Sequence, residues 1–93
     1  MSTHVSHREV WYSGRDQGVG FRAGVLAVSR GYEVTGYVQN LTDGRVYLHV
    51  EGAESELEEF LIGVAEKMDG HIKGEEVRSF SGVRTCRDFS IRR

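Results

Sequence analysis

Two stretches of alternating apolar and polar residues predict neighbouring, half-buried β-strands. The first runs from Val34 to Asn40 and the second from Arg45 to Glu51. In the second stretch the apolar positions are Val46, Leu48 and Val50, and the positions between them are Tyr47, His49 and Glu51. A period of two places each set on one face of a sheet. The Asp-Gly pair within residues 41–44 is a strong turn signal, so the two strands are predicted to be consecutive.

Further strands are predicted on either side of this pair. Residues 8–13 form the first, with Val10 and Tyr12 on one face. Residues 77–80 and 87–91 are the remaining candidates, and one of them is a short addition to the basic order. The lone cysteine, Cys86, is expected in a strand and without a catalytic role, because no partner motif accompanies it.

A first helix is predicted between the first two strands. Phe21, Val25 and Val28 follow the four-then-three spacing of one buried helix face. The helix is expected to begin at Phe21 or Arg22 and to end at Arg30.

A second helix is predicted after the third strand. Its apolar stripe consists of Leu57, Phe60, Leu61, Val64, Ala65 and Met68. Ser55 and Glu58 have the spacing of a capping box, in which each side chain accepts a backbone hydrogen bond from the other end of the first turn. Gly70 is expected to end the helix.

The resulting order, βαββαβ, predicts a ferredoxin-like α/β fold in one domain over residues 1–93. Right-handed crossovers place both helices on one face of a mostly antiparallel sheet, which gives a two-layer sandwich. This topology can bring the end of the second strand towards the loop after the first strand.

Composition and charge argue against a nucleic-acid-binding or membrane protein. The net charge of −2 provides no general attraction for nucleic acid or for an anionic membrane, and no apolar run approaches a membrane span. The N-terminal residues lack an apolar signal core, and a single cysteine cannot form an internal disulfide, so we expect a cytoplasmic protein. The four histidines, which lack metal-ligand spacing, are expected in surface or packing roles; they are His4, His7, His49 and His71.

The most informative segment is the loop between the first strand and the first helix. It reads Gly14-Arg15-Asp16-Gln17-Gly18-Val19-Gly20-Phe21-Arg22. Glycines allow sharp turns that direct several N–H groups at one point, and a helix start adds unpaired N–H groups and positive dipole. The guanidinium of Arg22 matches phosphate geometry. Together these features predict an anion site, with phosphate as the favoured ligand.

Asn40 is the second candidate, at the end of a strand and next to a turn. Its amide can donate to one group while it accepts from a water molecule, so it can position a nucleophile without acting as a base. A turn-opening role is the alternative, because asparagine is common at such positions.

Both segments together resemble the acylphosphatase family. The loop matches that family's Gly-x-Val-Gln-Gly-Val-x-Phe-Arg signature, and a second signature is matched by Gly36, Tyr37, Val38, Asn40, Gly44, Val46 and Gly52. The resemblance implies metal-free hydrolysis of the carboxyl–phosphate bond of acyl phosphates by a monomer that needs no cofactor. It implies that Arg22 and the amides of Gln17, Gly18, Val19, Gly20 and Phe21 hold the phosphate, while Asn40 orients the attacking water. Inorganic phosphate is then the product and an inhibitor.

One position departs from the family pattern. Asp16 stands where the family usually has valine, and a carboxylate pointing inward at about 8 Å would oppose an anion by roughly 2 kcal/mol at an effective dielectric near 20. We therefore expect Asp16 to point outward, towards Arg15 or Arg45.

Three other functions remain as alternatives. A related domain with weak catalysis could bind phosphate or handle carbamoyl phosphate. The βαββαβ order also occurs in RNA-binding domains, but residues 45–51 lack their Gly-aromatic pattern. A dinucleotide-binding unit fits Gly18-x-Gly20-x-x-Ala23 only loosely, and the chain is too short for a doubly wound sheet.

Overall fold

A computed structural model describes residues 4–14 and 19–93. Its elements are β1 (His4–Gly14), α1 (Val19–Ser29), β2 (Val34–Asn40), β3 (Val46–Gly52), α2 (Glu54–Lys67), β4 (Ile72–Val83) and β5 (Phe89–Arg92). The predicted βαββαβ order with one extra strand is confirmed, and the extra strand is β5.

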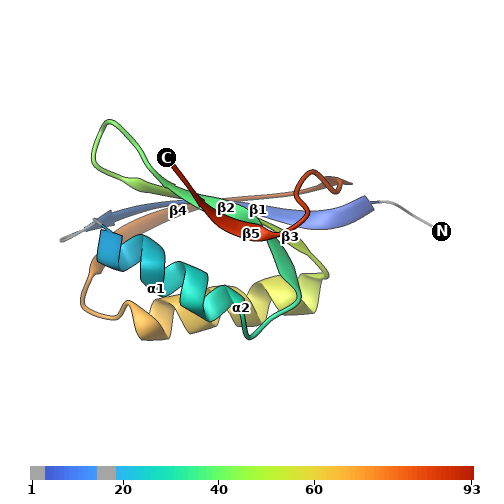
Figure 1. Cartoon of the computed structure of the whole chain (residues 1–93), viewed down its shortest axis with the longest axis horizontal. Helices are drawn as coiled ribbons and strands as arrows, with labels where there is room; N and C mark the ends of the chain where they lie inside the picture. Colours follow the sequence, from blue (N-terminus) through green and yellow to red (C-terminus); the bar gives the residue numbers. More distant parts are fainter. Residues whose placement is uncertain (1–3, 15–18) are drawn as a thin grey trace.

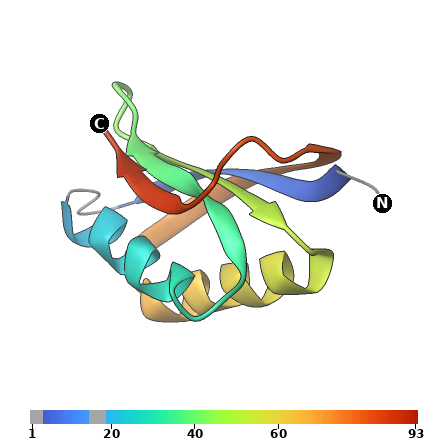
Figure 2. The same ribbon diagram turned by 45° about the vertical axis from the view of Figure 1, so that its right-hand side comes forward.

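The five strands form one sheet in the order β4-β1-β3-β2-β5. β1 is antiparallel to both β4 and β3, β2 is antiparallel to β3, and only the short β5 runs parallel to its neighbour. Both helices lie on the same side of the sheet, which leaves its other side free of helices (Figures 1 and 2). We call these sides the inner face and the outer face. The ferredoxin-like sandwich expected from the sequence is therefore confirmed.

The core lies between the inner face and the two helices. Its buried side chains are Val10, Tyr12, Phe21, Val25, Val34, Val38, Val46, Leu48, Val50, Leu57, Phe60, Val64 and Met68. The even-numbered positions of β1, β2 and β3 supply the strand half of this core, as the alternation predicted.

The predicted strand over 77–80 is too short, because β4 extends from Ile72 to Val83. β4 is an edge strand with mostly exposed side chains, so burial imposes no clear alternation on its sequence. It forms through backbone pairing with β1 along nearly its whole length. The expectation that Cys86 lies in a strand is wrong, since Cys86 falls in the segment 84–88 between β4 and β5.

The predicted capping box is also wrong. α2 begins one residue earlier than Ser55, and its N-cap is Ala53, which makes no side-chain capping bond. Ser55 and Glu58 consequently lie inside the helix. Glu54 instead connects the helix start to β1, where it accepts hydrogen bonds from Ser6 and Arg8. Tertiary contacts thus replace the local cap. At the other end, Gly70 follows the helix with a φ of +86°, as expected for its stop.

Candidate active site

The glycine-rich loop leads from the end of β1 into α1. Gln17 and Gly18 lie outside the described residues, as do Arg15 and Asp16. Val19 and Gly20 are the first two residues of α1, so their N–H groups belong to the unpaired start of a helix. Among the described residues, no atom outside the adjoining backbone lies within 4 Å of a Cβ placed on Gly20, so this side of the helix start is open towards them. An open helix start is suited to an anion.

Phe21 fixes this helix start against the sheet. Its side chain is 1% exposed, and its ring centroid lies 5.4 Å from that of Tyr12 on β1. Burial, with a smaller contribution from Glu75, raises the pKa of Tyr12 well above its ordinary value, so this phenol stays uncharged. The predicted phosphate-loop residue Phe21 is therefore also the anchor that holds the loop's helical end in place.

Arg22 follows directly in the same first turn of α1 and is half-buried. Its Nε atom is buried and has no hydrogen-bond partner among the described residues. A buried N–H without a partner is costly, and in native proteins such groups usually indicate a missing ligand, water or ion. The guanidinium therefore has donor capacity that an anion at the start of α1 can use.

Asn40 lies in the same row of the sheet as Tyr12. Val46 on β3 is the register partner of Tyr12 on one side and of Asn40 on the other. Two strand spacings separate the backbones of Tyr12 and Asn40 by about 10 Å. Residues opposite one another share a face, and Tyr12 and Val46 are both buried in the core. The side chain of Asn40 therefore belongs to the inner face, which is covered by α1 (Figure 1), the helix that carries Phe21 and Arg22.

The views of the ribbon agree with this register. The start of α1 and the end of β2 lie at the same end of the molecule, on the left in both orientations (Figures 1 and 2). The end of the second strand and the start of α1 thus lie at the same end of the described part of the chain, as the topology predicts, while residues 15–18 of the loop lie outside it.

The turn after Asn40 is held by its own hydrogen bonds. The N–H of Leu41 donates to the carbonyl of Arg45 at 2.8 Å, and Gly44 takes a φ of +93°. Hydrogen bonds from the backbone N–H and guanidinium of Arg45 lower the pKa of Asp43. Arg45 is thereby engaged with Asp43, while the expected direction of Asp16 lies outside the described residues.

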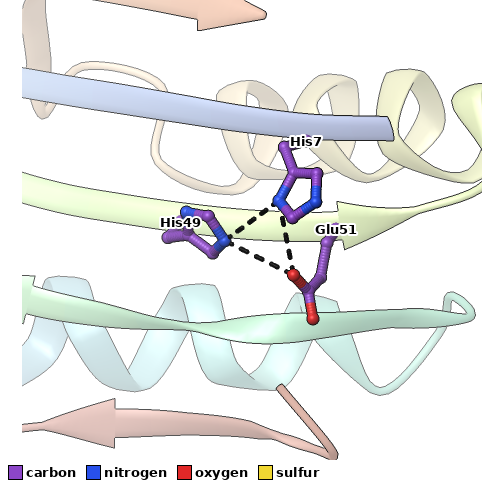
Figure 3. A group of neighbouring side chains, drawn as sticks. All are labelled: His7, His49 and Glu51. Atoms are coloured by element: carbon purple, nitrogen blue, oxygen red, sulfur yellow. Dashed lines mark hydrogen bonds and ion pairs between the residues drawn. The ribbon is translucent and has the colours of Figure 1, made fainter. Parts of the chain in front are cut away.

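A second group of chemistry-bearing side chains lies on the outer face. His7 on β1 stands opposite Glu51 on β3, and His49 is two residues before Glu51 on the same face. Figure 3 shows their polar atoms converging on one point. The structure therefore brings two histidines together that were expected to act separately. The His49-x-Glu51 alternation was a readable signal, but the third member, His7, is 42 residues away from His49.

Glu51 is the most restrained member of this group. Its side chain is fully buried, and its carboxylate accepts hydrogen bonds from the backbone N–H groups of Thr85 and Cys86 and from the Thr85 hydroxyl. Burial by itself raises the pKa of Glu51. The hydrogen bonds that the carboxylate accepts from Cys86, Thr85 and His49 outweigh this effect, so the pKa is lowered overall. The carboxylate form is therefore the stable one.

Helices long and apolar enough to cross a bilayer are absent from the described residues. A sequence model of the acylphosphatase family matches residues 8–91. The chain is 35% identical to an acylphosphatase of Methanospirillum hungatei, in an alignment that covers 87% of this chain and 90% of that protein. It is 48% identical to an acylphosphatase of Archaeoglobus fulgidus over 56 residues, which are 60% of this chain and only 63% of that relative.

A solved structure leads to the same family. The crystal structure of acylphosphatase from Bacillus subtilis superposes with a TM-score of 0.85 at 29% sequence identity, and the match covers 95% of this chain and 99% of that one. Fold similarity of this extent agrees with the sequence matches, and the family model spans nearly all of the chain. The protein therefore belongs to the acylphosphatase family.

Proposed function

We propose that the protein hydrolyses acyl phosphates to a carboxylate and inorganic phosphate. The observation that carries this proposal is the buried Nε of Arg22, which has no hydrogen-bond partner among the described residues, at a helix start on the same face and at the same end of the sheet as Asn40. An anion-binding group and a water-positioning group are thus available on one side of the molecule.

In the proposed mechanism, Arg22 and the N–H groups at the start of α1 bind the phosphate oxygens. These donors are fixed by the packing of Phe21 on Tyr12, so they need little reorganisation when charge develops during the reaction. Asn40 accepts a hydrogen bond from a water molecule and thereby orients the oxygen of that water towards phosphorus. The water oxygen bonds to phosphorus as the P–O bond to the carboxyl group breaks. The carboxylate leaves with the electron pair, and the water's proton passes to a phosphate oxygen, which gives inorganic phosphate.

The chemistry asks little of the protein beyond positioning. An acyl phosphate is a mixed anhydride with a good leaving group, so a strong general acid is not required. Phosphoryl transfer depends mainly on alignment and charge stabilisation. Gln17 and Gly18 complete the proposed phosphate loop with Val19, Gly20 and Phe21.

The test is hydrolysis of benzoyl phosphate by the purified protein in a chelator. Arg22→Ala and Asn40→Ala should each lower kcat/KM at least 100-fold while the circular dichroism spectrum is retained. Arg30→Ala, just beyond the other end of α1, and Gln39→Ala, on the outer face, are the matched controls and should stay within about threefold of wild type. Near-normal activity in Arg22→Ala or Asn40→Ala would remove that residue from the mechanism.

Inorganic phosphate should inhibit competitively. Phosphate binding without turnover by the wild type would instead favour a binding domain for phosphate or carbamoyl phosphate. Salt-sensitive RNA binding with no turnover would favour the nucleic-acid alternative.

As part of this proposal, the protein works as a cytoplasmic monomer without nucleic-acid partners. Sedimentation equilibrium at micromolar concentration should give a single species of the chain's own mass.

A further inference from the structure

We infer that His7, His49 and Glu51 form a binding site for a divalent transition-metal ion of the zinc type. Three potential ligand atoms face one another on the outer face: Nδ1 of His7, Nε2 of His49 and Oε2 of Glu51 (Figure 3). Two histidine nitrogens and one carboxylate oxygen are a ligand set that zinc accepts, with one position left for water.

The separations of these atoms match a tetrahedral metal centre. Nδ1 of His7 lies 3.3 Å from Nε2 of His49 and 3.3 Å from Oε2 of Glu51, and the remaining side of the triangle is 3.5 Å. Zinc-to-ligand distances of about 2.0–2.2 Å in a tetrahedron require ligand atoms about 3.3–3.6 Å apart. The ligand triangle therefore has the right size without any movement of the side chains.

The hydrogen bonding of His7 directs its Nδ1 atom towards Glu51. Its Nε2 lies 3.0 Å from the backbone carbonyl of Val83, which can only accept, so Nε2 carries the proton. In a neutral ring, Nδ1 then presents a lone pair to the Glu51 carboxylate. Two acceptors facing each other in a buried place repel unless a proton or a metal ion lies between them.

The surroundings are those of a prearranged metal site. A ligating histidine usually donates its other N–H to a carbonyl or carboxylate, and His7 does so to Val83. Its ring also stacks on Phe80 with centroids 4.7 Å apart, while His49 stacks on Tyr37 at 5.6 Å. The backbone N–H groups of segment 84–88 orient the Glu51 carboxylate, as described above. Each of the three proposed ligands is thus oriented by contacts with residues that are not themselves ligands.

His49 is the most exposed member of the cluster. The side chain of His49 is 12% exposed, whereas those of His7 and Glu51 are 2% and 0% exposed. The site lies on the outer face, opposite the face of Arg22 and Asn40. The expected role is structural, because the ion would join β1 and β3 and, through Glu51, segment 84–88.

The experiment uses the full chain, stripped of metal with a chelator and then titrated with Zn²⁺ by calorimetry and with Co²⁺ by visible absorption. We expect one ion per chain, the intense visible bands of tetrahedral Co²⁺, and a melting temperature that rises with free Zn²⁺ concentration. His49→Ala should weaken binding at least tenfold and remove the cobalt bands. His71→Ala, which changes an exposed histidine outside the cluster, is the control and should bind as wild type does.

His49→Ala is preferred to a Glu51 variant because Glu51 also satisfies backbone amides. Circular dichroism of the metal-free variant verifies that it folds. If the wild type binds no Zn²⁺, or if His49→Ala binds it as well as the wild type, the inference is overturned. Neither result bears on acyl phosphate hydrolysis, which is assayed in chelator.

Discussion

The carboxylate of Glu51 accepts a hydrogen bond of 2.9 Å from the backbone N–H of Thr85, 34 residues further along the chain. A buried side chain of β3 thereby holds the irregular segment between β4 and β5. The N–H of Cys86 donates to the same carboxylate at 2.5 Å, so two backbone donors depend on one side chain.

Truncating this carboxylate should destabilise the fold even without metal. Glu51→Ala leaves two backbone donors without their partner, and each such loss costs about 1–3 kcal/mol. We expect the free energy of unfolding to fall by at least about 2 kcal/mol in urea titrations with chelator present. Thr85→Val removes only a hydroxyl donor and should cost about 1 kcal/mol. A smaller effect for Glu51→Ala than for Thr85→Val would contradict this account.

The start of α2 can be improved by a side-chain cap. Ala53 has the extended N-cap conformation, with φ −68° and ψ 143°, but no side chain to accept a hydrogen bond. Ala53→Ser should stabilise the protein by about 1 kcal/mol, measured by thermal or urea unfolding. The complementary change, Ser55→Ala, should raise stability slightly, by a few tenths of a kcal/mol, since Ser55 lies inside the helix and alanine has the higher helix propensity. A loss of about 1 kcal/mol in Ser55→Ala would instead show that Ser55 caps the helix, as the capping box predicts.

Two glycine substitutions should have opposite effects. Gly36 has a φ of +149°, and a Cβ there would lie 1.9 Å from the carbonyl oxygen of His49 on the neighbouring strand. Gly36→Ala should therefore cost about 3 kcal/mol or more, or prevent folding. Gly20→Ala fills open space in α1 and should raise stability by about 0.5–1 kcal/mol. Urea unfolding measures both, and equal changes would count against the described backbone at Gly36.

The link between Glu54 and β1 should make stability depend on pH. Hydrogen bonds from Ser6 and then Arg8 lower the pKa of Glu54 in the folded state. The stabilisation is complete above the pKa of about 4.3 that an unfolded glutamate has, and it is lost as the pH falls through the lower folded pKa. The stability difference between wild type and Glu54→Gln should therefore be larger at neutral pH than at about pH 2.5.

Ser6→Ala provides the check on this mechanism. It removes the first of the two donors, so it should reduce the pH-dependent difference while leaving Arg8 in place. If the wild type and Glu54→Gln differ equally at both pH values, the folded-state pKa of Glu54 is not lowered.

The fold could be predicted from the sequence wherever burial imposes a pattern. β2 and β3 alternate clearly because one face of each is covered by helices, and β2 was predicted with its exact bounds. β4 was only partly predicted because its exposed side chains, such as Val77 and Arg78, follow no burial period. Its length is set by pairing with β1, which is information that a local pattern does not contain. The prediction of a capping box for α2 was wrong for a similar reason, because the contacts of Glu54 at the helix start come from the distant strand β1.

In the candidate site, too, local motifs could be predicted from the sequence, whereas contacts between distant strands could not. The loop before Arg22 is a continuous motif, so its chemistry could be predicted from neighbouring residues. The relation of Tyr12 to Asn40 depends on the register of two strand pairs through Val46. The meeting of His7 with His49 and Glu51 depends on the same long-range register, and only the His49-x-Glu51 alternation could be seen in the sequence.

The alternation along β3 has an evolutionary consequence. Val46, Leu48 and Val50 serve the core and the row that contains Asn40, while His49 and Glu51 serve the outer face. A substitution in one set therefore changes one face of the sheet directly, although Glu51 also holds the backbone of segment 84–88. A one-residue insertion in β3 would exchange the two faces and abolish both arrangements at once. An insertion or deletion of one residue within β3 is therefore tolerated only if both faces are rebuilt together.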